Sequence, residues 1–267
     1  MAAAATFEWV LPVSGRRVTL RQPTGRDEVL LLEAYGSEPA RAIMFVTQLA
    51  CDGLDAATMP VPDLDTLLLL LRQALLGDRL LAETLCPIPR CHARVDIIFG
   101  IAAFLAHHRP RRPRLRAWQV APCAEQAGWF SLRPTGAEVA TARFRLPTAG
   151  DERDIAGRAD AAAILAERCI AAEPHLPGIR RAAEAAMAAL APPLAGTLAG
   201  TCPECGADVP IGFDPRRYVL AELGARAGFI AADMDMLATR YHWTEHAILD
   251  LPNHRRTAYA EIARSAA

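Results

Sequence analysis

The sequence contains one local pattern twice, and this duplication constrains the fold more than any other feature. Segment 18–28 reads VTLRQPTGRDE, and segment 142–152 reads ARFRLPTAGDE. In both, strand-like residues end at an arginine, a Pro-Thr pair follows, and two acids stand three and four positions after the threonine. Proline ends a strand because it has no N–H for the ladder, and a threonine followed three residues later by an acid is typical of a helix N-terminus. Both segments therefore predict a strand that passes directly into a helix.

Each copy of this motif follows a predicted hairpin and precedes predicted helices. Turns that contain proline and glycine indicate hairpins of 7–11 with 16–21 and of 129–133 with 139–145. Apolar residues at helical spacing predict the helices, which cover 28–35, 39–50 and 64–76 in the first half and 151–171 and 177–190 in the second. The predicted fold class is α+β, mostly α, with two related hairpin-plus-helices units.

The same pattern predicts the domain organisation. The first unit covers 1–106, an Arg/Pro-rich linker covers 107–128, the second unit covers 129–215, and a C-terminal helical tail covers 216–267. In the linker, prolines prevent a regular helix and the arginines between Arg109 and Arg116 repel one another. We interpret this segment as solvated. The alternative interpretation is a nucleic-acid adaptor that grips phosphate with these arginines.

Four cysteines form two pairs, one near the end of each predicted unit. Cys86 and Cys91 are separated by four residues, and Cys202 and Cys205 form a Cys-Pro-Glu-Cys-Gly knuckle. Each pair leads into an apolar strand, 95–99 or 209–213. Such spacing allows two thiolates to reach one zinc ion, and tetrahedral zinc takes four ligands. The sequence therefore predicts one structural Zn²⁺ per chain, completed only when the two halves meet in a split zinc ribbon.

Other uses of these cysteines are less favoured. A thioredoxin-like redox pair would need a following helix, whereas a strand is predicted here. His92, next to Cys91, is an alternative zinc ligand. A closed set of four thiolates leaves no position for a reacting water, so we expect no enzymatic activity at this metal.

Composition excludes some classes of protein. The formal net charge is −1, without the basic excess of a dedicated nucleic-acid binder. The longest apolar runs are shorter than the roughly 20 residues that a transmembrane helix needs. Because the N-terminus has no charged region typical of a signal peptide, we expect a cytoplasmic protein that contacts no membrane and takes no small-molecule substrate.

One motif has the residue order of an inverted zinc protease. His242, Glu245 and His246 match His-x-x-Glu-His. Such a site needs a further ligand downstream, and Glu261 is the one acid among the last 16 residues. We instead interpret Thr244 as the cap of a short helix that Pro252 ends.

The chain resembles the baseplate hub assembly chaperone family of contractile-tailed phages, prophages and related contractile injection systems. Three segments carry the resemblance: 20–28 with its copy 144–152, the knuckle and strand at 202–213, and the closing segment 241–256. The resemblance implies a non-enzymatic role in tail or baseplate assembly, with baseplate or tail proteins as partners. The protein would act in the cytoplasm of a bacterium that carries the phage or prophage, and would then leave the particle or stay in the virion.

The tail contains the residues that we expect to contact a partner. Interfaces favour aromatic and arginine side chains, and the candidates are Trp243, Leu251, Arg255, Arg256 and Tyr259. The alternative is a tail that packs back on its own core. Removal of 241–267 is expected to spare folding.

Overall fold

The computed structural model describes residues 5–137, 140–172 and 178–265. Within these ranges the fold is a mixture of helices and small antiparallel sheets. The helices, one of them the short 3₁₀ helix η1, are α1 (Gly25–Glu33), α2 (Glu38–Leu49), η1 (Ala56–Thr58), α3 (Val61–Leu76), α4 (Ile101–His107), α5 (Ala149–Ile155), α6 (Ala161–Cys169), α7 (Ile179–Leu190), α8 (Pro215–Ala227), α9 (Ile230–Tyr241), α10 (Glu245–Leu249) and α11 (Asn253–Ser265).

Three of the sheets are isolated hairpins, and the fourth has four strands. The hairpins pair β1 (Thr6–Val10) with β2 (Arg17–Arg21), β3 (Arg79–Leu85) with β4 (Arg94–Gly100), and β9 (Gly196–Thr201) with β10 (Asp208–Phe213). The fourth sheet has the order β5 (Trp118–Pro122), β6 (Trp129–Pro134), β7 (Ala142–Arg145) and β8 (Ile170–Ala172). The predicted pairing of β1 with β2 and of β6 with β7 is confirmed; Val139, at the start of the second prediction, lies outside the described residues.

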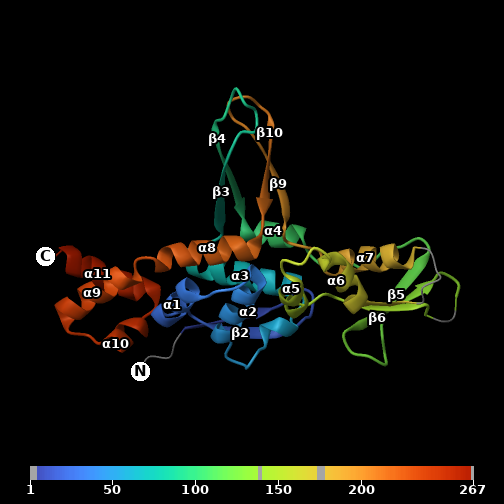
Figure 1. The fold of residues 1–267 in the computed structure, drawn as a ribbon, viewed down its shortest axis with the longest axis horizontal. Helices are drawn as coiled ribbons and strands as arrows, with labels where there is room; N and C mark the ends of the chain where they lie inside the picture. The colour runs from blue at the N-terminus through green and yellow to red at the C-terminus, as the bar shows by residue number, and fades with distance from the viewer. Residues whose placement is uncertain (1–4, 138–139, 173–177, 266–267) are drawn as a thin grey trace.

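The molecule is an elongated body with one projecting arm (Figure 1). The hairpins β3–β4 and β9–β10 stand side by side and form this arm, which we call the double-hairpin arm. Helix α8 runs along the body at the base of the arm. Helices α9 to α11 lie at one end of the body, and the sheet β5–β8 with α7 lies at the other.

The main core is built around α3, which is buried on nearly every side. This core contains apolar residues of β1, β2 and α2, and also Val219, Leu220 and Leu223 of α8. A separate cluster joins β5–β8 to α7, and another, around Leu237, Ile248 and Ala260, joins α9 to α11. The segment predicted as one tail therefore divides: α8 packs into the main core, and α9–α11 have a small core of their own.

The two copies of the strand-to-helix motif have the same local geometry. The guanidinium of Arg21 donates two hydrogen bonds of 2.7 Å to the Asp27 carboxylate, and that of Arg145 donates two of 2.5 and 2.9 Å to Asp151. Each aspartate also accepts from the backbone N–H of the threonine three residues before it. These contacts form the capping box at the start of α1 and of α5.

Each motif also contacts a hydrophobic-Pro pair at the start of another helix. The backbone N–H of Ala149 donates to the carbonyl of Met59 at 2.9 Å, just before α3. At the first motif, the N–H of Gly25 donates to the carbonyl of Leu251 at 3.1 Å, just before α11. The threonines pair correspondingly with Pro60 and Pro252. The C-terminal helix thus takes at the first motif the place that α3 takes at the second.

The second half departs from the prediction in two places. The segment 151–171 was expected to be helical throughout, but it breaks between α5 and α6 and ends in β8, which pairs with β7. The C-terminal part of the predicted linker 107–128 forms β5, which adds to β6. The predicted helix is interrupted at Gly157, which has a φ of 78°, and at 170–172 the pairing with β7 overrides local helical spacing. The second difference is a local hairpin, because β5 pairs with the strand that follows it in the chain.

We expect Asp151→Asn to destabilise the protein near neutral pH by about 1–2 kcal/mol. Burial opposes ionisation of Asp151, but hydrogen bonds from Arg145 and Thr148 outweigh it and lower its pKa to about 2. Because the folded-state pKa is lowered, this contribution is present above the unfolded pKa near 4 and is lost as pH falls towards 2. Urea unfolding at pH 7 and pH 2.5 measures it. Asp235→Asn, at an exposed position of α9, is the control; an equal loss at both pH values would contradict the assignment.

Candidate metal centre

The four paired cysteines meet at the tip of the double-hairpin arm. Cys86 and Cys91 lie in the turn between β3 and β4, and Cys202 and Cys205 lie in the turn between β9 and β10. These turns are the points of the arm farthest from the body (Figure 1). The four Sγ atoms all lie within 4.8 Å of one another, so the side chains could hold one metal ion.

Thiols from opposite hairpins are in direct contact. Cys86 Sγ lies 3.6 Å from Cys205 Sγ, and Cys91 Sγ lies 3.8 Å from Cys202 Sγ. Thiolates bound to one zinc ion at about 2.3 Å in a tetrahedron are separated by similar distances. The donor set and its spacing therefore fit a tetrahedral, thiolate-binding metal.

Backbone amides point at the sulfur atoms. Cys86 accepts from the N–H of Ile88, Cys91 from that of Ala93, and Cys202 from those of Cys205 and Glu204. Such amides favour the negative thiolate form. They lower the pKa of Cys202 to about 7, whereas burial and the neighbouring thiols outweigh the amide at Cys86 and raise its pKa to about 12. A metal ion displaces these protons, because it binds the thiolate.

A small apolar layer supports the cysteines. Val95 of β4 and Val209 of β10 are buried directly beneath the thiols. Further down the arm, a Cβ on Gly200 would lie 3.0 Å from the side chain of Ile97, so the two hairpins pack closely here. The strand registers place Val95 and Ile97 on one face of β4, and Val209 and Ile211 on one face of β10. The two hairpins thus meet face to face.

Histidine does not contribute to the cluster. His92 is exposed with a φ of 45° and does not belong to the group of donors. Within the described residues, the four cysteines are the one group of potential ligands that is close enough to hold a metal ion. Cys51, Cys123 and Cys169 lie outside it.

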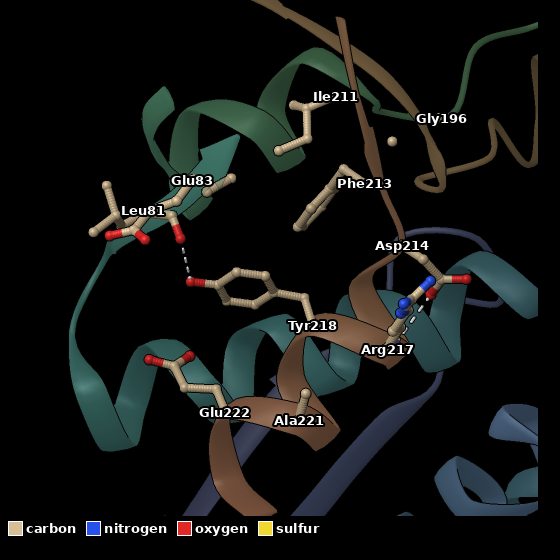
Figure 2. Close-up of a pocket in the computed structure, with 12 residues that line it drawn as sticks. Leu81, Glu83, Gly196, Ile211, Phe213, Asp214, Arg217, Tyr218, Ala221 and Glu222 are labelled. Carbon is tan, nitrogen blue, oxygen red and sulfur yellow. Dashed lines mark hydrogen bonds between the residues drawn. The ribbon is translucent and has the colours of Figure 1, made fainter. Parts of the chain in front are cut away.

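A groove lies at the base of the arm and has no counterpart in the sequence predictions. It has a volume of about 610 Å³ and is walled by residues of β3 and β10, with α8 beneath. The Tyr218 hydroxyl on α8 donates to the carbonyl of Leu81 on β3 at 2.9 Å and so ties the arm to the body (Figure 2). The spacing of apolar residues in the sequence did not predict this groove, because the groove forms where three segments that are distant in the chain come together.

The predicted partner-binding residues of the tail do not form one exposed patch. Arg255 is exposed, but Trp243, Tyr259 and Leu251 are half-buried. Trp243 stacks on Tyr241, and Tyr259 meets both rings edge-on. Arg256 is 1% exposed and pairs with Glu28 of α1 and Asp233 of α9. This placement corrects the assignment of Arg256, which holds the tail to the body. Removal of 241–267 would take away the buried partner of Glu28, so the structure favours a loss of stability where the sequence predicted that folding is spared.

The histidines of the protease-like motif are not arranged for catalysis. His242 ends α9 with a φ of 56°, while His246 lies in α10, so no single helix presents both. His246 contacts Arg26 and Asp250. Thr244 accepts from the N–H of Ala247 at 3.2 Å, which confirms its predicted role as a helix cap.

The arginine-rich segment lies between α4 and β5. The side chains of its arginines, Arg109, Arg111, Arg112, Arg114 and Arg116, are exposed. Near its start, the N–H of Arg111 donates to the carbonyl of Ala189 in α7 at 2.7 Å. This contact links the segment to the end of the body that carries β5–β8.

Comparisons with protein-family models, with curated proteins and with solved structures found no match to this chain. Among the described residues, no helix is both long and apolar enough to cross a membrane. The geometry of the site and the sequence motifs are therefore the basis for assigning a function.

Proposed function

We propose that this chain is a non-enzymatic assembly protein whose double-hairpin arm is held together by one structural zinc ion. The cluster of four Sγ atoms at the arm tip carries the proposal. Soft thiolate donors in a compact, four-ligand set favour zinc over the oxygen-preferring Mg²⁺ and Ca²⁺. With four protein ligands, the ion has no open position for water, which supports a structural role and not a catalytic one.

We further propose that the two strand-to-helix motifs belong to duplicated units joined by a split zinc ribbon. The matched ion pairs, capping boxes and hydrophobic-Pro contacts of the two motifs support this interpretation. The acids that follow them, buried Glu28 and half-buried Glu152, also have corresponding partners, since Glu28 pairs with Arg256 and Glu152 with Arg216. Each unit supplies one hairpin of the arm, so the metal joins the units at their far ends.

The assembly role in a contractile-tail baseplate is proposed from the resemblance of the motif, knuckle and tail segments. A projecting arm and a groove at its base offer surfaces for protein partners. We expect that deletion of the gene from a phage or prophage would give tail tubes and sheaths without complete baseplates, as seen by electron microscopy of lysates. Normal, infectious particles from the deletion strain would contradict the role.

Metal content tests the site separately. Protein purified without added metal is expected to contain about one zinc ion per chain by elemental analysis, as a four-thiolate site requires. Cobalt-substituted protein is expected to show the visible absorption of tetrahedral thiolate coordination. Metal-free protein with an intact, protease-resistant arm would exclude the proposed site.

A further inference from the structure

The cysteine cluster combines one exposed thiol with buried thiols in contact across the two hairpins. Cys205 is exposed, Cys91 is half-buried, and Cys86 and Cys202 are buried. Each of the two contacts, 3.6 Å for Cys86–Cys205 and 3.8 Å for Cys91–Cys202, therefore joins a buried sulfur to a more accessible one on the opposite hairpin. An oxidant can reach the accessible sulfur, and the buried sulfur lies in position to react next.

We propose that the cluster is also a redox modification site, at which oxidation by a low-molecular-weight disulfide replaces the metal with two disulfides across the arm, Cys86–Cys205 and Cys91–Cys202. This inference rests on the proposed metal site and names its regulation. The turns of the two hairpins are then joined by zinc in a reducing compartment and by two disulfides in an oxidising one.

The reaction proceeds by two thiol–disulfide exchanges at each pair. The Cys205 thiolate attacks oxidised glutathione, forms a mixed disulfide and releases one glutathione thiolate. Cys86 then attacks the Cys205 sulfur, forms the protein disulfide and releases the second glutathione thiolate. Two protein thiolates lose two electrons, which reduce one glutathione disulfide. Cys91 and Cys202 react in the same way, and the zinc ion leaves because it has lost its ligands.

Formation of each disulfide needs the two sulfurs to approach from these contact distances to about 2.05 Å. Turn residues at the end of an arm can move by that amount more readily than core residues can. The pairing across hairpins distinguishes this site from an ordinary Cys-x-x-Cys couple, whose disulfide would form within one turn.

Peptide mapping of the oxidised full-length protein tests the pairing. Zinc content is measured first, and the native protein is then treated with oxidised glutathione. Cleavage after arginine separates Cys86, in 80–90, from Cys91, in 91–94, and cleavage after Glu204 separates Cys202 from Cys205. The cleavage after glutamate also cuts after Glu83, so mass spectrometry without reductant is expected to find 84–90 joined to the peptide of Cys205, and 91–94 joined to that of Cys202. One zinc ion should be released for every two disulfides formed, and reductant with zinc should reverse the change.

Disulfides within the turns, Cys86–Cys91 and Cys202–Cys205, would overturn the inference. Zinc that stays bound after the three cysteines outside the cluster are fully oxidised would also overturn it. Oxidation in guanidinium chloride is the matched control, because the unfolded chain lacks the contacts and should give mixed pairings. The variant Cys123→Ser, outside the cluster, should map like the native protein. If the starting protein contains no zinc but forms the cross-arm disulfides, the metal proposal fails and the pairing survives.

Discussion

Replacement of Cys202 by serine is expected to abolish metal binding and to open the double-hairpin arm. A serine hydroxyl is a poor zinc ligand, and three thiolates leave the site open to water. Cys202 is buried beside Val95 and Val209, so the loss also disturbs the layer below. Structural zinc contributes on the order of 10 kcal/mol in small peptides. Because this apolar layer is small, we expect the proposed metal to supply most of the free energy that holds the two turns together.

Local unfolding of the arm is the specific outcome. Hydrogen exchange is expected to accelerate in 80–99 and 196–213 of Cys202→Ser, while α3 in the main core keeps its protection. The melting temperature should fall by roughly 10 °C, which corresponds to about 3–5 kcal/mol at about 2–4 °C per kcal/mol in a chain of this size. This is less than zinc contributes in peptides because the arm unfolds separately from the main core. A chelator added to the native protein should reproduce both effects. Cys123→Ser is the matched control, and equal metal content in the two variants would refute the assignment.

Local rules explain why much of the site could be predicted from sequence. Proline and threonine at fixed offsets determine the strand ends and helix starts at 18–28 and 142–152, because these features depend on neighbours within four residues. The knuckle spacing identified the four cysteines for the same reason. The sequence also predicted that the two pairs come together in one cluster, because one proposed ion would need all four thiolates, and the structure places the four Sγ atoms within 4.8 Å of one another.

The remaining features depend on contacts between distant segments. The sequence predicted a metal site that joins two halves, but not that this site lies at the tip of a projecting arm. The exposure of β3 and β10 depends on which other segments pack against them, and no local pattern in the sequence shows this. Strand β8 was missed because its backbone pairs with β7, 26 to 30 residues earlier in the chain, while its own residues favour helix. A charged residue in an amphipathic tail is normally exposed, so nothing local indicated that Arg256 is buried and Arg255 is not.

Loss of Arg256 is expected to produce the largest destabilisation of any substitution of a charged residue in the tail. Its side chain is 1% exposed, and it neutralises Glu28, a carboxylate whose pKa burial raises above its ordinary value in spite of the arginine. Asp233 keeps a second partner, Arg264, at 2.9 Å. Arg256→Ala would therefore leave Glu28 as the uncompensated buried charge, at a cost of about 3–5 kcal/mol.

Denaturant unfolding of Arg256→Ala against Arg255→Ala measures this cost with a matched control, since adjacent arginines of one helix differ in burial. The control should change stability by less than about 0.5 kcal/mol.

Without the arginine, the pKa of Glu28 rises further, so the folded variant holds a proton that the unfolded chain has lost. Stability of Arg256→Ala then falls as pH rises above the unfolded pKa near 4, and the deficit is smaller at pH 5 than at pH 8. A double variant, Glu28→Gln with Arg256→Met, should recover most of the loss, because Glu28 no longer carries a charge and Asp233 keeps its ion pair with Arg264. Equal destabilisation by the two single arginine variants would show that the buried pair does not fasten the tail to the body.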